Sequence, residues 1–178
     1  MNDESEAPDE IVWHGKYITA RKRGRWEYVS RSRGIRAAVI LAVDEADHVL
    51  LVEQYRVPLG RRCIELPAGL IGDDDGAEGE EPVAAAAREL EEETGYRAGR
   101  MEVLGEFWSS PGMVSESFTL VRAHDLVKVG KGGGTDSEDI TVHRVPLAGI
   151  GDDIAKWREA GLAIDVRLLM LLGPALLA

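Results

Sequence analysis

Apolar residues recur along the chain with two different spacings, which predict strands in some segments and helices in others. Short runs rich in β-branched and aliphatic residues, typical of buried strands, lie at 37–43, 49–54, 101–108, 117–123 and 140–145. Residues 82–94, 150–160 and 165–172 instead show the spacing of amphipathic helices. Because strands and helices alternate loosely, we expect a mixed α/β (α+β) fold around a central sheet.

The segment 82–94 carries clear signals at both ends. Pro82 is expected to open the helix, where its missing N–H costs nothing, and Gly95 is expected to cap its C-terminus. The stripe predicted to face the core consists of Val83, Ala86, Ala87, Leu90 and Thr94. Asp165 is the expected N-cap of the last helix.

The first 35 residues differ in pattern from the rest of the chain. Residues 1–10 are polar and without periodicity, which predicts a disordered tail. Residues 11–35 hold aromatic and β-branched residues in short stretches broken by Gly15 and Gly24, which predicts a small antiparallel sheet outside the main core. Residues 36–178 are then expected to form the main domain.

The charge of the chain is unevenly distributed. The 178 residues include 21 Lys and Arg against 32 Asp and Glu, and this net charge of -11 argues against binding nucleic acid through the overall field. Residues 69–96 contain ten acidic residues and one basic residue, whereas residues 21–36 contain seven basic residues and one acidic residue. An acidic block and a basic block in one chain suit a metal ion together with an anionic ligand.

The cysteine content and the hydropathy bear on the compartment. Cys63 is the single cysteine, so no internal disulfide can form, which fits a reducing environment. The acidic N-terminus lacks a signal pattern, and the longest strongly apolar stretch, 168–172, is far too short to span a bilayer. A cytoplasmic enzyme without a membrane partner is the simplest expectation.

Carboxylates gather on one side of the helix predicted at 82–94. Glu89 and Glu93 are four residues apart and therefore share a face, with Glu92 beside them. Clustered carboxylates suit Mg²⁺, which prefers oxygen ligands and keeps waters for a phosphate substrate. Arg88, four residues before Glu92, is placed to orient that carboxylate. A solvated acidic helix face is the alternative, as for most charge runs.

Residues 88–96, Arg-Glu-Leu-Glu-Glu-Glu-Thr-Gly-Tyr, resemble the second half of the Nudix box, REUxEExGU, in which U is a bulky apolar residue. Glu80 lies eight residues before Arg88, as the box requires. The glycine of the box does not fit, because position 74 is Asp and the natural candidate, Gly69, lies eleven residues before Glu80. Five residues, 73–77, therefore look inserted. The resemblance implies a Nudix α/β/α sandwich with a central mixed sheet.

Further segments are similar to the ADP-ribose and ADP-sugar pyrophosphatase branch of this family. They are residues 52–56, 63–71, 15–17 and 25–31, the acidic loop 136–140, and Ser110-Pro111-Gly112, with Pro111 fifteen residues after Tyr96. The resemblance implies hydrolysis of the diphosphate of ADP-ribose to AMP and ribose 5-phosphate. Other nucleoside diphosphate sugars, such as ADP-glucose or GDP-mannose, are alternative substrates, and a non-catalytic nucleotide-sensing Nudix domain is a further alternative.

The same resemblance assigns roles to single residues of the metal site. Glu89, Glu93 and the backbone carbonyl of Ala68 are expected to ligate Mg²⁺, or Mn²⁺, with about two or three ions per site and with help from Glu92. Glu138 is expected to be the catalytic base, in a flexible Gly-rich loop (Gly132–Gly134) able to close over substrate, and Glu92 is expected to be a second catalytic residue. The neighbours of Glu138, Asp136 and Asp139, remain candidates, as does a merely solvated loop.

For substrate binding, the resemblance implies a homodimer with exchanged N-terminal strands. The residues expected to bind substrate are Tyr17, Trp26, Arg31, Arg56, Pro111 and Gly112. Trp26 would stack on adenine with Tyr17 opposite, Arg31 would reach the ligand from the partner subunit, and Arg56 would contact the diphosphate. Two alternatives stay open: Trp26 as a core or interface residue, and Arg56 as a partner of Glu65 or Glu53.

Overall fold

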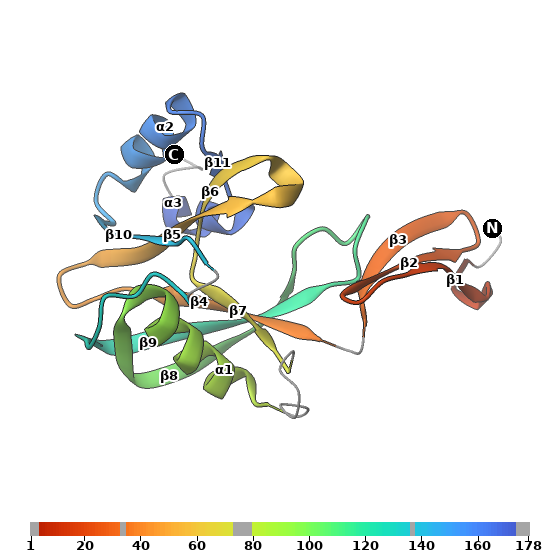
Figure 1. The fold of residues 1–178 in the computed structure, drawn as a ribbon, viewed down its shortest axis with the longest axis horizontal. Coiled ribbons are helices and arrows are strands. Elements are labelled where there is room, and N and C mark those ends of the chain that lie inside the picture. Colours follow the sequence, from red (N-terminus) through yellow and green to blue (C-terminus); the bar gives the residue numbers. More distant parts are fainter. Residues whose placement is uncertain (1–3, 33–34, 73–79, 136–137, 174–178) are drawn as a thin grey trace.

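The computed structural model describes residues 4–32, 35–72, 80–135 and 138–173, and its elements form the mixed α+β fold that the sequence pattern predicts (Figure 1). The strands are β1 (Asp9–His14), β2 (Ile18–Arg23), β3 (Trp26–Arg31), β4 (Arg36–Ala42), β5 (His48–Arg56), β6 (Arg61–Glu65), β7 (Ala68–Ile71), β8 (Tyr96–Trp108), β9 (Ser117–Lys128), β10 (Thr141–Pro146) and β11 (Ala163–Ile164). The helices are α1 (Pro82–Glu89), α2 (Ile150–Glu159) and α3 (Leu169–Leu172), with short helical turns η1 (Glu4–Glu6), η3 (Val57–Leu59), η4 (Leu90–Thr94) and η5 (Val166–Leu168).

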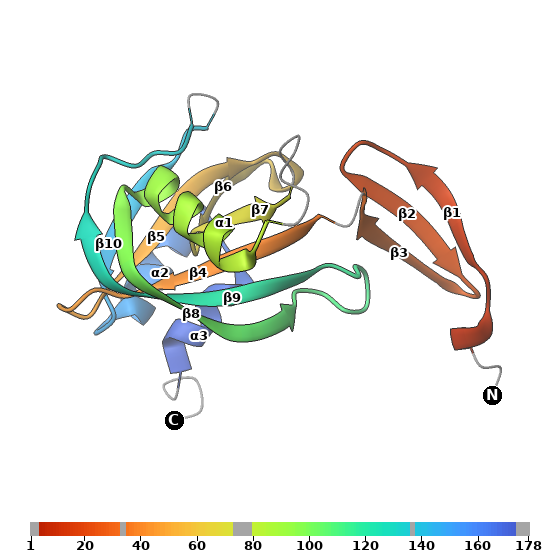
Figure 2. The ribbon, with the colours of Figure 1, turned by 90° about the horizontal axis from the view of Figure 1, so that it is seen from below.

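Two four-stranded sheets, in the orders β7-β4-β9-β8 and β10-β5-β6-β11, build the body of the molecule. The pairs β4–β9 and β6–β11 are parallel, and the other pairs are antiparallel. Side chains of β4 alternate between two apolar clusters. Ala38 and Ile40 pack in the cluster that includes α1, whereas Val39 packs in the cluster that includes α2. Helices therefore cover the sheets from opposite sides (Figures 1 and 2).

The helix that carries the acidic residues differs from its prediction in two respects. It is α-helical only over Pro82–Glu89, and Leu90–Thr94 continue it as a turn of π-helix that ends at Gly95 in the left-handed conformation. The predicted buried stripe is also out of phase, because Val83 and Ala87 are exposed whereas Ala85 is buried. Four consecutive alanines, 84–87, give no indication of phase in the sequence, and packing against the sheet decides it.

The start of the helix predicted at 165–172 is confirmed. Asp165 caps the turn, with a side-chain oxygen that accepts a hydrogen bond from the backbone N–H of Arg167 at 2.7 Å. The first turn is the 3₁₀ turn η5 rather than α-helix, so α3 is shorter than predicted. No helix in the described part of the chain has the length and apolar character needed to cross a membrane.

Strands β1, β2 and β3 form a separate three-stranded antiparallel sheet that stands away from the body in both views (Figures 1 and 2). Its link to the body runs through β3, where the N–H of Val29 donates to the carbonyl of Met113 at 3.0 Å and the N–H of Ser115 donates to the carbonyl of Val29 at 2.9 Å. The sheet leaves large apolar side chains exposed, among them Ile11, Trp13 and Trp26.

The acidic N-terminus is more ordered than the predicted tail of residues 1–10. The turn η1 and the start of β1 at Asp9 both lie within it, and residues 1–3 lie outside the described residues. Basic and phenolic groups hold these acids in place. Glu4 accepts from the N–H of Arg25 at 3.1 Å, and Asp9 accepts from the hydroxyl of Tyr28 at 2.8 Å and pairs with Arg21.

Candidate functional site

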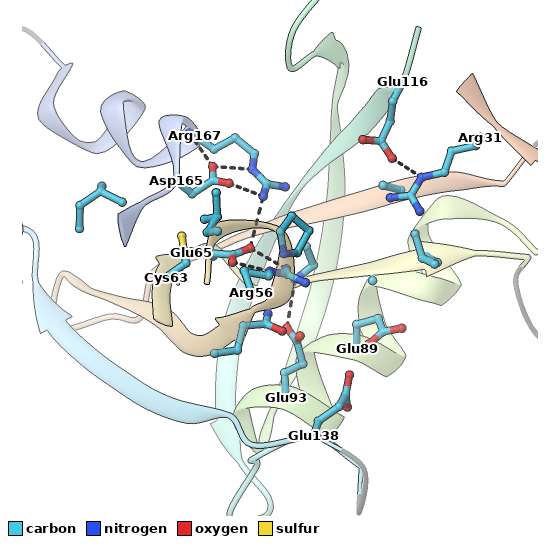
Figure 3. A pocket seen from close by; sticks show the side chains of 18 residues that line it. Arg31, Arg56, Cys63, Glu65, Glu89, Glu93, Glu116, Glu138, Asp165 and Arg167 are labelled. Atoms are coloured by element: carbon cyan, nitrogen blue, oxygen red, sulfur yellow. Dashed lines mark hydrogen bonds and ion pairs between the residues drawn. The ribbon is translucent and has the colours of Figure 1, made fainter. Parts of the chain in front are cut away.

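A cavity of about 610 Å³ lies where the edges of both sheets meet α1 and η4 (Figure 3). Among the residues to which the sequence assigns a catalytic, metal-binding or substrate-binding role, those that line it are Arg31, Arg56, Ala68, Glu89, Glu93 and Glu138. Tyr17, Trp26, Glu92, Pro111 and Gly112 do not line it. The fold thus brings together most of the charged residues that the sequence associates with metal and diphosphate binding.

Two carboxylates of the acidic helix face this cavity, that of Glu93 from a buried position and that of Glu89 from a half-buried one. Glu93, 3% exposed, accepts a hydrogen bond from the backbone N–H of Ala68 at 3.0 Å. Burial raises the pKa of Glu93 to about 8, and the nearby charges of Glu89 and Glu138 act in the same direction. Burial likewise raises the pKa of Glu89 to about 7, against the opposing effect of Arg88. In both groups burial outweighs the nearby positive charge, which comes from Arg88 at Glu89 and from Arg56 at Glu93, so further positive charge would stabilise the ionised carboxylates.

A bound cation would supply that charge, and the donor set fits one. Glu89 and Glu93 offer hard oxygen ligands at a cavity wall, as Mg²⁺ requires. Within the described residues, no group of three or more His, Cys, Asp or Glu side chains lies close enough to hold a metal ion without further ligands. Mg²⁺ usually completes its coordination shell with waters and substrate phosphates. One or two protein carboxylates are therefore enough to bind it.

The stability of the metal-free protein is expected to fall as the pH rises. The pKa values of Glu89 and Glu93 in the fold lie above their ordinary 4.5, so the folded state binds more protons than the unfolded state over this interval. Their contribution is fully present below pH 4.5 and is lost as the pH passes about 7 and 8. We expect a melting temperature in EDTA that drops by roughly 5–10 °C between pH 5 and pH 8.5.

Addition of Mg²⁺ should recover more of that melting temperature at pH 8.5 than at pH 5, because the ion binds the ionised carboxylates. Differential scanning fluorimetry over a pH series, with and without Mg²⁺, measures both effects. A metal-free protein whose stability rises over this interval would contradict the raised pKa values of Glu89 and Glu93.

Gly69 on β7 allows the carboxylate of Glu89 to pack directly against the strand backbone. A Cβ atom at position 69 would lie 2.0 Å from Cδ of Glu89 and 2.1 Å from its Oε1. A methyl group there must displace the carboxylate from the cavity wall. The family motif already pointed to this glycine, and the structure gives its presence at this position a steric reason.

Gly69→Ala is therefore expected to weaken activity at limiting Mg²⁺ by about 10²-fold, because small misplacements of ligating groups have effects of that size. Titration of activity with Mg²⁺ measures the change as a higher half-saturating concentration. Gly151→Ala in α2 is the matched control, since a Cβ atom at position 151 would lie 3.6 Å from its nearest neighbour, Cδ2 of Leu172. Equal metal dependence of both variants would remove Gly69 from this role.

Arg88 joins the acidic residues of the helix to one another. Its guanidinium lies 2.8 Å from Glu89 Oε1, 3.2 Å from Glu92 Oε2 and 3.6 Å from Glu80 Oε1. The expected contact between Arg88 and Glu92 is thus present. Glu92 is exposed and lies outside the cavity lining, and Arg88 links its carboxylate to that of Glu89.

Arg56 forms an ion pair with Glu65, which the sequence left open as an alternative to phosphate binding. Its guanidinium donates to both carboxylate oxygens of Glu65, at 2.6 and 2.7 Å, and it still lines the cavity. Glu65 also lies 3.5 Å from Arg167, which itself donates to Asp165 at 2.6 Å. Figure 3 shows this chain of charges from Asp165 and Arg167 through Glu65 to Arg56, whose charge also acts on Glu93.

Arg167 is a cavity residue that sequence reasoning missed. It stands on η5, and β11 brings it there by pairing in parallel with β6 through the partners Ala163 and Cys63. No motif surrounds it in the sequence. The only signal was Asp165, identified as a helix cap, which in the structure both caps η5 and pairs with Arg167.

The structure separates two of the three acidic candidates for the base, Glu138 and Asp139. Glu138 lines the cavity and accepts a hydrogen bond from the N–H of Thr135 at 2.8 Å. Asp139 is 88% exposed, pairs with Arg62 at 2.7 Å and is not part of the lining. Asp136 lies outside the described residues, as do the inserted residues 73–77. Of the acids of this loop that the structure describes, Glu138 is the one that lines the cavity.

The other residues expected to bind substrate lie outside the larger cavity, except Arg31. Trp26, Pro111 and Gly112 line a smaller cavity of about 260 Å³ between β3 and the loop after β8. Tyr17 lines neither cavity. Arg31 lies in the larger cavity of its own chain, where it pairs with Glu116 at 2.5 Å, so it reaches that cavity without a second chain.

Comparison with known proteins gives a consistent result. Residues 33–161 match the family described as the NUDIX domain. The chain is similar to the ADP-ribose pyrophosphatase of Bacillus subtilis, with 40% identity over 90 residues that cover 51% of this chain and 46% of that protein. It is also similar to the GDP-mannose pyrophosphatase of Cronobacter sakazakii, with 36% identity over 149 residues that cover 79% of this chain and 72% of that protein.

A solved structure described as an ADP compounds hydrolase shares the fold. It superposes with a TM-score of 0.68 and 25% sequence identity, covering 93% of this chain and 89% of the other. The chain spans about half the length of several of the curated relatives that it matches.

Proposed function

Because the chain belongs to the Nudix family, we propose that it hydrolyses the diphosphate of ADP-ribose to AMP and ribose 5-phosphate. The observation that carries the proposal is the larger cavity, whose lining combines the carboxylates of Glu89 and Glu93 with the guanidinium groups of Arg56 and Arg167. Such a lining offers carboxylates for a cation together with guanidinium groups, and a diphosphate is the ligand class that uses both. The similarity to an ADP-ribose pyrophosphatase supports the adenine nucleotide.

In the proposed reaction, Glu89 and Glu93 hold Mg²⁺, or Mn²⁺, together with the carbonyl of Ala68. When bound, these ions neutralise the diphosphate and lower the pKa of a water. Arg56 binds and orients the phosphates. Glu138 accepts a proton from the attacking water while the oxygen of that water bonds to phosphorus. The bridging P–O bond breaks, so that AMP and ribose 5-phosphate separate.

We further propose that the sheet β1–β2–β3 forms a homodimer and holds the adenine. The exposed apolar side chains of this sheet support the dimer, since monomers rarely leave so many together. The cavity shared by Trp26, Pro111 and Gly112 supports an adenine site, with Tyr17 supplied from across the dimer axis. Sedimentation equilibrium at micromolar concentration tests the dimer, and a monomeric protein that is fully active contradicts it.

A cytoplasmic location is part of the same proposal. The support is the single cysteine, Cys63, which is buried and free and which leaves no partner in the chain for a disulfide. Fractionation of the native cells, followed by detection of the protein in each compartment, tests this location.

The substrate is tested with a panel of ADP-ribose, ADP-glucose and GDP-mannose at saturating Mg²⁺, with release of the nucleoside monophosphate as the readout. The expected result is the highest kcat/KM for ADP-ribose. GDP-mannose is the second candidate, because the similar GDP-mannose pyrophosphatase is matched over most of its length. Release of GMP from GDP-mannose without release of AMP from ADP-ribose would overturn the first assignment in favour of the second.

A further inference from the structure

The glycine loop, residues 130–134, is docked onto the end of the helix that carries the metal-site carboxylates. The N–H of Gly133 donates to the carbonyl of Glu93 at 2.8 Å, and the N–H of Gly134 donates to the carbonyl of Glu92 at 3.0 Å. Carbonyls at the end of a helix have no partner within the helix. Here the loop satisfies two of them, so it is bonded to the same residues whose side chains form the site.

The contact between the two segments leaves no room for side chains. A Cβ atom on Gly132 would lie 2.3 Å from the backbone carbon of Thr94 and 2.6 Å from the carbonyl oxygen of Glu93. A Cβ atom on Gly95 would lie 2.4 Å from the carbonyl oxygen of Gly130. Gly132 is also in the left-handed region, at a φ of 69°. The glycines thus serve close packing, which differs from the flexible, closing loop that their sequence suggested.

A second attachment holds the other side of Glu138. Arg62 on β6 donates to the carboxylate of Asp139 at 2.7 Å and to its backbone carbonyl at 3.1 Å. The same guanidinium donates to the carboxylate of Glu53 on β5 at 2.5 Å. The residue that follows Glu138 is therefore tied to two strands of the body, through its backbone as well as its side chain.

We propose that Gly132 and Arg62 are positioning residues that hold Glu138 toward Glu89 and Glu93 from the two ends of its loop. The inference rests on the proposed function, in which Glu138 is the base. It assigns a purpose to the glycine loop and to Asp139, neither of which has one in the proposed reaction. Because a misplacement of about 1 Å can cost 10²-fold in rate, a base on a loop needs such attachments.

The first test compares Gly132→Ala with Gly130→Ala in the same loop. The nearest atom to a Cβ on Gly130 would be 3.9 Å away, so this control keeps the loop in place. Gly132→Ala is expected to lower kcat by about 10²-fold, with KM and the half-saturating Mg²⁺ concentration unchanged. A rise in the Mg²⁺ requirement with equal kcat would show that Gly132 supports the metal ligands instead and would overturn the proposal.

The second test is a pair of double-mutant cycles with Glu138→Gln. If Gly132 and Arg62 act through Glu138, then Gly132→Ala and Arg62→Met should add little further loss of kcat in the Glu138→Gln background. If the fold-losses of kcat from the single variants multiply in both double variants, the residues act independently of Glu138 and the proposal is overturned. Arg62→Lys, which keeps one donor for Asp139, should recover part of the kcat that Arg62→Met loses. If Gly132→Ala does not fold, as its melting curve would show, the Arg62 cycle decides alone.

The two failures are distinguishable in these measurements. If Glu138→Gln leaves kcat at the wild-type value, Glu138 is not the base and the proposed function is wrong in that respect. Gly132 and Arg62 then cannot act by holding a base at Glu138. If Glu138→Gln is slow but Gly132→Ala and Arg62→Met retain full kcat, the proposed function stands and the positioning role is wrong.

Discussion

Replacement of Glu93 by glutamine is expected to lower kcat/KM by about 10³-fold and to make the metal-free protein more stable above pH 7. The loss follows because a metal ligand contributes several kcal/mol to the stabilisation of charge in the transition state. The gain in stability follows because burial raises the pKa of Glu93 to about 8, so its ionised form opposes folding. Glutamine fits the same space and still accepts from the N–H of Ala68.

Glu91→Gln is the matched control, two residues away on the same turn. Its side chain is exposed and pairs with Arg97 at 2.8 Å outside the cavity. We expect near-normal kcat/KM and an unchanged response of the melting temperature to Mg²⁺ for this variant. Glu93→Gln should instead lose most of that response. If both variants keep it, Glu93 is not part of the metal site.

Glu138→Gln is expected to lower kcat by about 10²–10⁴-fold while KM changes little, which is the usual effect of removing a general base. The amide keeps the size of the side chain and cannot accept a proton. The acidic limb of the pH–rate profile should also change in this variant, because the limb reports the group that must be ionised. Stopped-time assays of AMP release across pH measure both quantities.

Asp139→Asn is the comparison that separates the two neighbouring acids. Asp139 is exposed and faces Arg62, so its loss should cost kcat roughly tenfold or less and leave the shape of the pH profile unchanged. An Asp139→Asn variant that is slower than Glu138→Gln would show that the base had been assigned to the wrong residue.

The core of the candidate site could be predicted because its residues are local in sequence. Glu89 and Glu93 lie one turn apart on one helix, and the spacing of their motif identifies them without tertiary information. Gly69 and Glu65 precede the same helix in a short segment. The strand and helix classes of the main body also followed from periodicity, since each run is long and bounded by turn residues.

What could not be predicted depends on contacts between distant segments. Arg167 reaches the cavity only because the two-residue strand β11 pairs with β6, and two residues carry no periodicity that a sequence pattern can show. The phase of α1 was hidden in a run of alanines, which are equally suited to either face. The packing of Gly132 against Thr94 could not be predicted from the sequence either. Glycines in a loop are as common in mobile segments as in tightly packed ones.

The pairing of the N-terminal arginines has a kinetic consequence. Arg21 and Arg23 face Asp9, Arg25 faces Glu4, and Arg31 faces Glu116. These four arginines lie beside three carboxylates, because Asp9 pairs with both Arg21 and Arg23, so most of their charge is compensated locally. The remaining field in solvent is further screened over the Debye length of about 8 Å. Electrostatic steering of a nucleotide toward the cavity should therefore be slight. The association rate of the nucleotide should depend only weakly on ionic strength. Discrimination among anionic ligands should then depend on how well each fits the cavity once bound.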